Sequence, residues 1–260
     1  MNILVIAPHP DDETIGCGGA LCRHAARGDR VTVVFLTSGE LGLKDRPPKQ
    51  AWKVRESEAR AAGRILGIAR LEFFRLPDWT VGEHIKRGAR LLLPILKAER
   101  PEIIYLPHPR DWHPDHQAAL PLLRAAWRGL RLSMSRAFRE RCRRFSLSPL
   151  DGEWAGVRGP LPRRGSGPPC ARELSWRLPK VEVRAYEVWT PLSAFDHVED
   201  ISRVMPRKLR ALRAHRSQLG EFDYERAVRG LNQFRGALAA QCPYAEVFQT
   251  IHPRQGGFGW

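Results

Sequence analysis

The first 120 residues alternate short apolar runs with longer segments of helical periodicity. The apolar runs, which predict buried strands, are residues 2–7, 31–36, 71–76 and 103–106. The segments that predict helices are residues 13–27, 51–66 and 82–99, the last with a kink at Pro94. Because strands and helices alternate, we expect right-handed crossovers and a Rossmann-like α/β fold, with a mostly parallel sheet flanked by helices.

The pattern changes over residues 131–180, where apolar periodicity is weak and Arg, Pro, Gly and Ser dominate. We interpret this stretch as a flexible, irregular basic insertion. The elements predicted after it are a strand over 181–189, helices over 206–217 and 224–240, and a short strand over 244–250. A chain of 260 residues fits one α/β unit, so we expect a single domain over residues 1–260 that the insertion interrupts.

Composition excludes several classes of protein. The five cysteines are odd in number, scattered and without a Cys-x-x-Cys pair, so they predict buried thiols rather than a disulfide framework or a cysteine zinc site. No apolar run approaches the roughly 20 residues that a membrane helix needs, and the chain enters its first strand without a basic leader. We therefore expect a cytoplasmic protein without a membrane span.

The net charge of +15 is unevenly distributed along the chain. Residues 131–180 contain twelve basic and four acidic residues and no histidine, so this stretch alone supplies +8 of the net charge. Three explanations compete: a solvated basic insertion, a loop that binds anionic groups of a substrate or partner, and a segment translated out of frame. We favour the first or the third, because the composition is irregular and the regular pattern resumes abruptly at Val181.

The charge also allows an alternative function, a basic nucleic-acid-binding protein on a degenerate hydrolase scaffold. This alternative rests on charge alone, without the regular interleaving of basic and aromatic residues that a stacking platform has. We expect no specific nucleic-acid partner.

Two of the predicted strands are followed by clusters of histidine and aspartate. The first cluster, His9-Pro10-Asp11-Asp12-Glu13, follows strand 2–7, and the second, His113-Pro114-Asp115-His116, follows strand 103–106 after a short loop. Open α/β sheets bind ligands at the carboxyl ends of their strands. Hydrolytic zinc sites typically take three His and carboxylate ligands and leave one position to water, so the two clusters together predict a metal-hydrolase site.

The first cluster supplies two ligands by itself. His9 and Asp12 can converge on one ion across a turn that Pro10 stiffens, while Asp11 points elsewhere. The third ligand is then expected from one of the two histidines of the second cluster. The other histidine and Asp11 would be a general base and an oxyanion stabiliser.

Both clusters also have a purely structural interpretation. Asp11, Asp12 and Glu13 could cap the following helix, since acidic residues favour a helix N-terminus. Asp115 could likewise lie in the first turn of an ordinary helix. Two such clusters at two strand ends of one βαβ pattern nevertheless favour a metal site over coincidence.

The clusters resemble the two signature motifs of the LmbE-like, or PIG-L, family of zinc-dependent N-deacetylases. The resembling segments are residues 7–19, Thr37 to Glu40, Arg55-x-x-Glu58, His113 to His116, Tyr186 to Leu192, Lys208 and His215-x-Ser217-Gln218. Together the resemblance covers about residues 1–128 and 181–251.

The resemblance implies a role for each residue of the two clusters. The metal ligands that it implies are His9, Asp12 and His116. It implies that Asp11 is the general base and that His113 stabilises the oxyanion or acts as the acid. Asp115 would then orient and charge His113. Arg55 would bind substrate, although as a residue expected on an exposed helix face it could equally form a surface ion pair with Glu56 or Glu58.

The function that the resemblance implies is hydrolysis of an N-acetyl group on an N-acetylglucosamine-type sugar or conjugate, releasing acetate and a free amine. Zn²⁺ would be the cofactor, although Fe²⁺ or another divalent metal accepts the same ligands. The expected partner is a small-molecule amino sugar, and a homo-oligomer is compatible with the sequence. The segment Arg110-Asp111-Trp112 is somewhat like the glucosaminyl-malate branch of the family. Carbohydrate binding without turnover is disfavoured, because every expected ligand and base is present.

Overall fold

The computed structural model describes residues 1–146, 181–220 and 222–252, with the backbone alone for residues 134 and 136–146. The strands are β1 (Asn2–Ala7), β2 (Arg30–Phe35), β3 (Arg70–Phe73), β4 (Ile103–Pro107), β5 (Glu182–Tyr186), β6 (His197–Asp200) and β7 (Ala245–Thr250). The helices are α1 (Asp12–Ala26), α2 (Pro48–Leu66), α3 (Ile85–Glu99), α4 (Pro114–Ser146), α6 (Met205–Leu212) and α7 (Tyr224–Arg235). Short 3-10 turns cover Glu40–Gly42 and Val81–His84, and a π-helical turn covers Gly236–Ala240.

The strands form one sheet in the order β3-β2-β1-β4-β5-β7-β6. The first five strands are parallel, whereas β7 is antiparallel to both β5 and β6. The structure thus confirms the expected mostly parallel α/β fold. The strand order changes direction between β1 and β4, and the crevice outside the carboxyl ends at such a switch point is where α/β sheets bind ligands.

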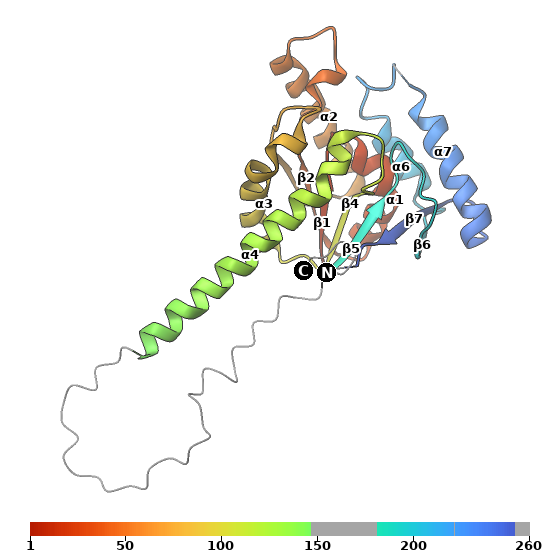
Figure 1. Ribbon diagram of the computed structural model, residues 1–260. Coiled ribbons are helices and arrows are strands. Elements are labelled where there is room, and N and C mark those ends of the chain that lie inside the picture. Colours follow the sequence, from red (N-terminus) through yellow and green to blue (C-terminus); the bar gives the residue numbers. More distant parts are fainter. Residues whose placement is uncertain (147–180, 221, 253–260) are drawn as a thin grey trace, which may run out of the picture.

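Alternating residues of the central strands face two separate helical layers. Leu4 and Ile6 belong to the core on the side of α3 and α4, whereas Ile3 and Val5 belong to the core on the side of α1, α2 and α6 (Figure 1). Since successive side chains of a strand point to opposite faces, a sheet covered on both sides has strands that are apolar throughout. This explains why β1 appears in the sequence as one uninterrupted apolar run.

The predicted element boundaries differ from the observed ones mainly in the second half of the chain. The expected loss of regular structure at residue 131 is wrong, because α4 continues to Ser146 and extends beyond the body of the molecule in Figure 1. The rest of the predicted insertion, residues 147–180, lies outside the described residues. β6 was not predicted, and its sequence His-Val-Glu-Asp, with one apolar residue, explains why.

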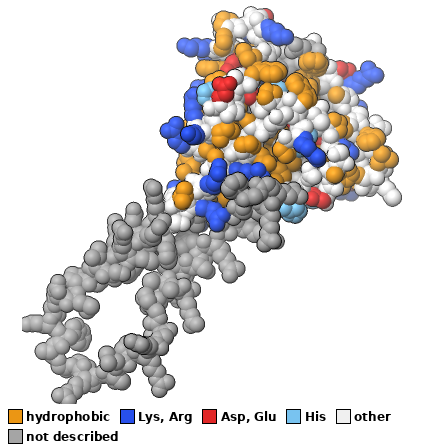
Figure 2. All heavy atoms as spheres, in the orientation of Figure 1, with side chains coloured by type: hydrophobic (Ala, Val, Ile, Leu, Met, Phe, Trp, Pro, Cys, Tyr) orange, Lys and Arg blue, Asp and Glu red, His pale blue; other side chains and the backbone are white. Residues whose placement is uncertain are grey.

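Two further structural observations bear on the expected partners. Within the described residues, no helix combines the length and apolar character that crossing a bilayer requires. On the face drawn in Figure 2, Lys and Arg side chains occupy several separate places among hydrophobic and acidic side chains. This face therefore does not present the continuous basic stripe that typifies nucleic-acid-binding proteins.

Candidate metal and catalytic centre

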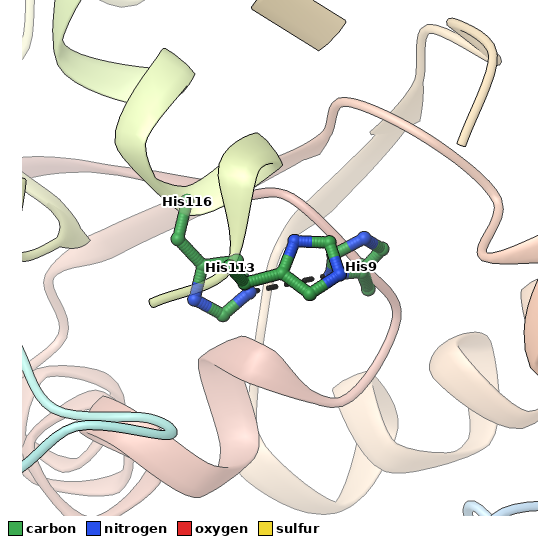
Figure 3. A group of neighbouring side chains, drawn as sticks. All are labelled: His9, His113 and His116. Atoms are coloured by element: carbon green, nitrogen blue, oxygen red, sulfur yellow. Dashed lines mark hydrogen bonds between the residues drawn. The ribbon is translucent and has the colours of Figure 1, made fainter. Parts of the chain in front are cut away.

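Pairing between β1 and β4 brings the two histidine-aspartate clusters together. Ile3 of β1 is in register with Ile103 of β4, so the loops that leave these strands start side by side at the same edge of the sheet. His9 lies in the first loop, whereas His113 immediately precedes α4 and His116 lies in its first turn. Figure 3 shows the three imidazole rings gathered at this point from the two segments.

Three of the ring and carboxylate atoms form a nearly equilateral triangle. Asp12 Oδ2 lies 3.2 Å from both His9 Nδ1 and His116 Nε2, and these two nitrogens are 3.3 Å apart. Two tetrahedral ligands that each bind zinc at about 2.0–2.1 Å are themselves about 3.3 Å apart. The spacing and chemistry of these three groups therefore fit a divalent metal ion.

The second nitrogen of each of these histidines faces a carboxylate. His9 Nε2 lies 3.0 Å from Asp78 Oδ1 and 3.3 Å from Asp115 Oδ2, and His116 Nδ1 lies 3.4 Å from Asp111 Oδ1. Metal-binding histidines commonly direct the nitrogen that does not bind the metal to a carboxylate, which fixes the ring and raises its basicity. Sequence reasoning assigned no catalytic or metal-binding role to Asp78 or Asp111, although Asp111 lies in the segment Arg110-Asp111-Trp112 directly before the second cluster.

The carboxylates make this buried region favourable for positive charge. Burial lowers the pKa of His9, but Asp115, Asp12 and Asp78 raise it by more, so that it lies well above its usual value. In the same way burial lowers the pKa of His116, but Asp12 and Asp111 together outweigh burial and raise that pKa to about 9. The carboxylates that favour protons on two neighbouring imidazoles create a negative electrostatic potential at this point. The same potential favours the binding of a divalent cation.

Asp11 is held by an arginine from α2. Arg55 Nη2 donates hydrogen bonds to Asp11 Oδ2 at 3.0 Å and to the carbonyl oxygen of Pro10 at 2.7 Å. Burial is the largest influence on the Asp11 carboxyl group and raises its pKa to about 6. Asp11 occupies the N-cap position of α1, but its side chain accepts no capping hydrogen bond, and its N–H instead donates to Glu13 Oε2 at 3.1 Å. The helix-cap interpretation therefore does not account for the Asp11 carboxylate.

Arg55 is buried, which overturns the alternative of a surface ion pair. Glu56 instead binds Arg75 and the hydroxyl of Ser38, and Glu58 accepts hydrogen bonds from Ser217. The structure thus places Arg55 against the predicted base.

His113 is oriented by the backbone of Asp115 rather than by its carboxylate. The N–H of Asp115 donates to His113 Nδ1 at 3.2 Å, so the neutral imidazole carries its proton on Nε2. Burial lowers the pKa of His113 to about 4, which favours this neutral form. The Asp115 carboxylate accepts hydrogen bonds from the N–H groups of Trp79 and Val81. Asp115 was expected to orient and charge His113 through its carboxylate. In the structure, Asp115 contacts His113 through its backbone N–H instead.

His113 also belongs to a second group of three potential metal ligands. One of its nitrogens lies within 4.8 Å of nitrogens of His9 and His116.

His215 is a buried residue near this centre to which sequence reasoning gave no role. Neither ring nitrogen forms a hydrogen bond with any residue that the structure describes, and Nε2 lies 3.7 Å from Glu13 Oε1. Buried polar groups are normally hydrogen-bonded, so the lack of a hydrogen bond among the described residues makes His215 a further candidate for the site. The sequence signal that could have identified His215 is the segment His215-x-Ser217-Gln218, which resembles the family.

Comparisons with known proteins identify similar sequences and folds. Residues 4–127 match the family model PIG-L, described as GlcNAc-PI de-N-acetylase. The diacetylchitobiose deacetylase of Thermococcus kodakarensis is 26% identical over 95% of this chain and 88% of its own length. The conserved protein TT1542 of Thermus thermophilus is 28% identical, with a TM-score of 0.68 over 96% of this chain and 94% of its own.

A third relative shows that the fold alone does not define the reaction. GalB, the 4-carboxy-2-hydroxymuconate hydratase of Pseudomonas putida, has a TM-score of 0.65 over 98% of both chains at 24% identity, a likeness of fold only. The family model, by contrast, spans both histidine-aspartate clusters. Residues 4–127 of this chain therefore belong to the PIG-L (LmbE-like) family.

Proposed function

We propose that this protein is a zinc-dependent hydrolase that removes the N-acetyl group from an N-acetylglucosamine-type sugar or conjugate. The observation that carries the proposal is the triangle of His9, Asp12 and His116 with Asp11 beside it. Membership in the PIG-L family and the similarity to a diacetylchitobiose deacetylase support the amino-sugar substrate.

His9 Nδ1, Asp12 Oδ2 and His116 Nε2 are the atoms that would hold the ion. When bound, zinc acts as a Lewis acid toward the amide carbonyl and lowers the pKa of water to about 7. Asp78, Asp115 and Asp111 hold the two imidazoles in the orientation that the ligand role requires.

Asp11 is the proposed general base. Its carboxylate accepts the proton of the attacking water and then delivers that proton to the nitrogen of the departing amine. Arg55 fixes the carboxylate and keeps one oxygen engaged, so the other oxygen is available to the water.

His113 is the proposed donor to the amide oxygen. Its Nδ1 accepts from the backbone, so its Nε2–H can donate to the oxygen as negative charge develops there. Neutral histidine is sufficient for this role because only a hydrogen bond is required.

The test is amine release from N-acetylglucosamine and from N,N′-diacetylchitobiose by the zinc-loaded protein. Replacing Asp11 by Asn should lower kcat at least about 100-fold while metal content stays at one ion per chain, since the base is removed and the ligands are kept. His116→Ala should lose both the metal and the activity. Activity and metal content would be measured on the same preparations.

The matched controls are Asp45→Asn and His252→Ala, which change exposed residues of the same types. Both should retain the activity of the parent. A metal-free parent, or an Asp11→Asn variant with full activity, would contradict the assignment.

A further inference from the structure

A surface groove runs along the line where α2 packs on α6. It lies between residues 53–65 of α2 and residues 210–216, which comprise the end of α6 and the turn after it, and its volume is about 780 Å³. None of the described residues that line it belongs to the histidine-aspartate centre. We call it the α2–α6 groove.

The floor of the α2–α6 groove is apolar and long. Val54, Ala61, Ile65 and Ala214 line it, and each of these side chains is half-buried. Val54, Ala61 and Ile65 follow one another at intervals of seven and four residues, so they share one face of α2. Positions 53 and 65 are twelve residues, or about 18 Å, apart along the helix. Small-molecule sites enclose most of their ligand, whereas a long groove between two helices suits a third helix.

The rim of the α2–α6 groove is basic. Its exposed cationic side chains are Lys53, Arg210, Arg213 and Arg216. The acidic lining residue, Glu58, already accepts hydrogen bonds from the N–H and the hydroxyl of Ser217, at 2.8 and 2.6 Å. Arg213 forms an ion pair with Glu225, but the other three cations form none with the residues that the structure describes. The rim therefore carries positive charge that the chain itself leaves uncompensated.

We propose that the α2–α6 groove binds an acidic amphipathic helix of another protein. The apolar face of such a helix would cover the floor, and carboxylates on either side of that face would meet the rim cations. An apolar centre with a polar rim is the usual anatomy of a protein interface, and complementary charge selects the partner. This inference does not depend on the proposed function, because the α2–α6 groove and the centre share no described residue.

Charge disfavours a second copy of this chain as the occupant. The net charge is +15, so two copies repel each other. Among the described helices only α1 carries more acidic than basic residues, and most of its side chains are buried. The segment 147–180 of the chain contains six basic and three acidic residues, so it does not complement the rim either.

The floor disfavours two other anionic ligands. A nucleic acid without a paired strand gains affinity by stacking its bases on aromatic side chains, and the described lining residues include none. A free phosphate would use the rim cations but would leave the apolar floor uncovered. A helix with one apolar and one acidic face uses both features.

The test measures binding of a labelled peptide to the zinc-loaded full chain by fluorescence anisotropy. The probe is a 15-residue peptide with leucines on one helical face and glutamates on the other. We expect saturable binding that weakens as salt is added, since the rim charges are exposed. The same peptide with serines in place of the leucines should bind at least about tenfold more weakly, because it cannot cover the floor. A single-stranded DNA of 15 nucleotides tests for a general affinity for polyanions.

Two groove variants locate the binding. Arg210→Glu combined with Arg216→Glu should weaken binding at least about tenfold, because like charges then face each other. Ala61→Glu, which places a carboxylate on the floor, should have a similar effect. The matched control is Arg87→Glu combined with Arg90→Glu, which reverses two exposed charges of α3. Circular dichroism and Tm would verify that each variant is folded.

Several results would overturn the inference. They are absence of binding to the parent, equal affinity for the serine peptide or the DNA, and unchanged affinity in the folded groove variants. A parent dimer that the groove variants dissociate, measured by analytical ultracentrifugation, would identify a second copy as the occupant and refute it as well. Amine release from the proposed substrates is a separate measurement, so failure of the proposed function would not be confused with failure of this inference.

Discussion

Asp11 combines an unusual backbone conformation with a carboxylate that a buried arginine holds. Its φ is +123°, which few residues other than glycine adopt, and this conformation turns the side chain away from the N-terminus of α1 toward Arg55. The arginine joins two separate loops to α2, because its remaining hydrogen bonds go to the carbonyl oxygens of Pro10 and Gly39. The position of the proposed base therefore depends on the geometry of one guanidinium group.

Replacing Arg55 by lysine tests this dependence. Lysine keeps the positive charge but cannot reproduce the planar fork that reaches Asp11 and two carbonyl oxygens together. We expect kcat to fall about 10- to 100-fold, the loss of one or two hydrogen bonds to a charged group, with unchanged metal content. Arg64→Lys, on the exposed face of the same helix, should behave as the parent. Full activity in Arg55→Lys would show that charge alone suffices.

Gly16 illustrates a different constraint at the residue scale. A Cβ atom at this position would lie 2.2 Å from Tyr186 Cδ2 and 2.7 Å from the carbonyl oxygen of Glu187. We expect Gly16→Ala to lower the free energy of unfolding by about 1–3 kcal/mol or more, because helix α1 must move away from β5. Gly129→Ala, where the nearest atom would be 3.7 Å away, should instead be neutral or stabilising. Urea denaturation would measure both, and equal effects would refute the packing argument.

Sequence reasoning identified some of these residues and missed others for physical reasons. His9, Asp12 and His116 belong to dense motifs at strand ends, and the parallel topology places such ends side by side. Asp78 follows β3 and His215 follows α6, each as an isolated residue of its chemical type. The proximity of Asp78 to the centre depends on how the loop after β3 closes over the sheet, which no local pattern encodes. For His215 the only signal was the resemblance of His215-x-Ser217-Gln218 to the family.

At the scale of elements, a buried lysine connects α1 and α6 with α7 and β7. Lys208 Nζ donates to the carbonyl oxygen of Ile15, to Asn232 Oδ1 and to Glu246 Oε1, all within 2.8 Å. Glu246 in turn accepts hydrogen bonds from the N–H groups of Gly19 and Ala20. Both charges are fully buried, so each depends on the other for compensation.

Lys208→Met should therefore lower the free energy of unfolding by about 3–5 kcal/mol, because it leaves the Glu246 carboxylate buried without a cation. Combining it with Glu246→Gln should recover part of the loss, since the uncompensated charge is removed. Denaturant unfolding of the two single variants and the double variant would measure the coupling. Strictly additive effects would contradict the paired arrangement.

The elements themselves were largely predictable where both faces of the sheet are covered. The central strands β1, β2 and β4 are almost entirely apolar, so their positions were predicted within one residue; the polar exceptions are Asn2, Arg30 and Thr32. β3 ends at Phe73, before the predicted limit of 76, and Arg75 shortly after it has a φ of +50°. β6 is a short edge strand with a largely polar sequence, and such strands lack the apolar run that marks the interior ones.

At the scale of the molecule, the proposed ion would join segments from two βα units. A ligand that binds only the folded state stabilises it by about 4 kcal/mol at 1,000 times its Kd, which corresponds to roughly 10 °C in Tm for a chain of this size. We expect EDTA to lower the Tm of the zinc-loaded protein by about this amount. The His116→Ala variant should show no such shift, and an equal shift in that variant would place the ion elsewhere.

The distance along the chain between the proposed ligands also has a consequence for biosynthesis. His9 and His116 are 107 positions apart, and they meet only because β4 pairs with β1. A nascent chain emerging from the ribosome carries His9 and Asp12 from the start, but it gains its third ligand only after β4 and the first turn of α4 have been synthesised. Tight zinc binding would therefore require that the central sheet has already formed. Zinc would then not assist the earliest folding steps.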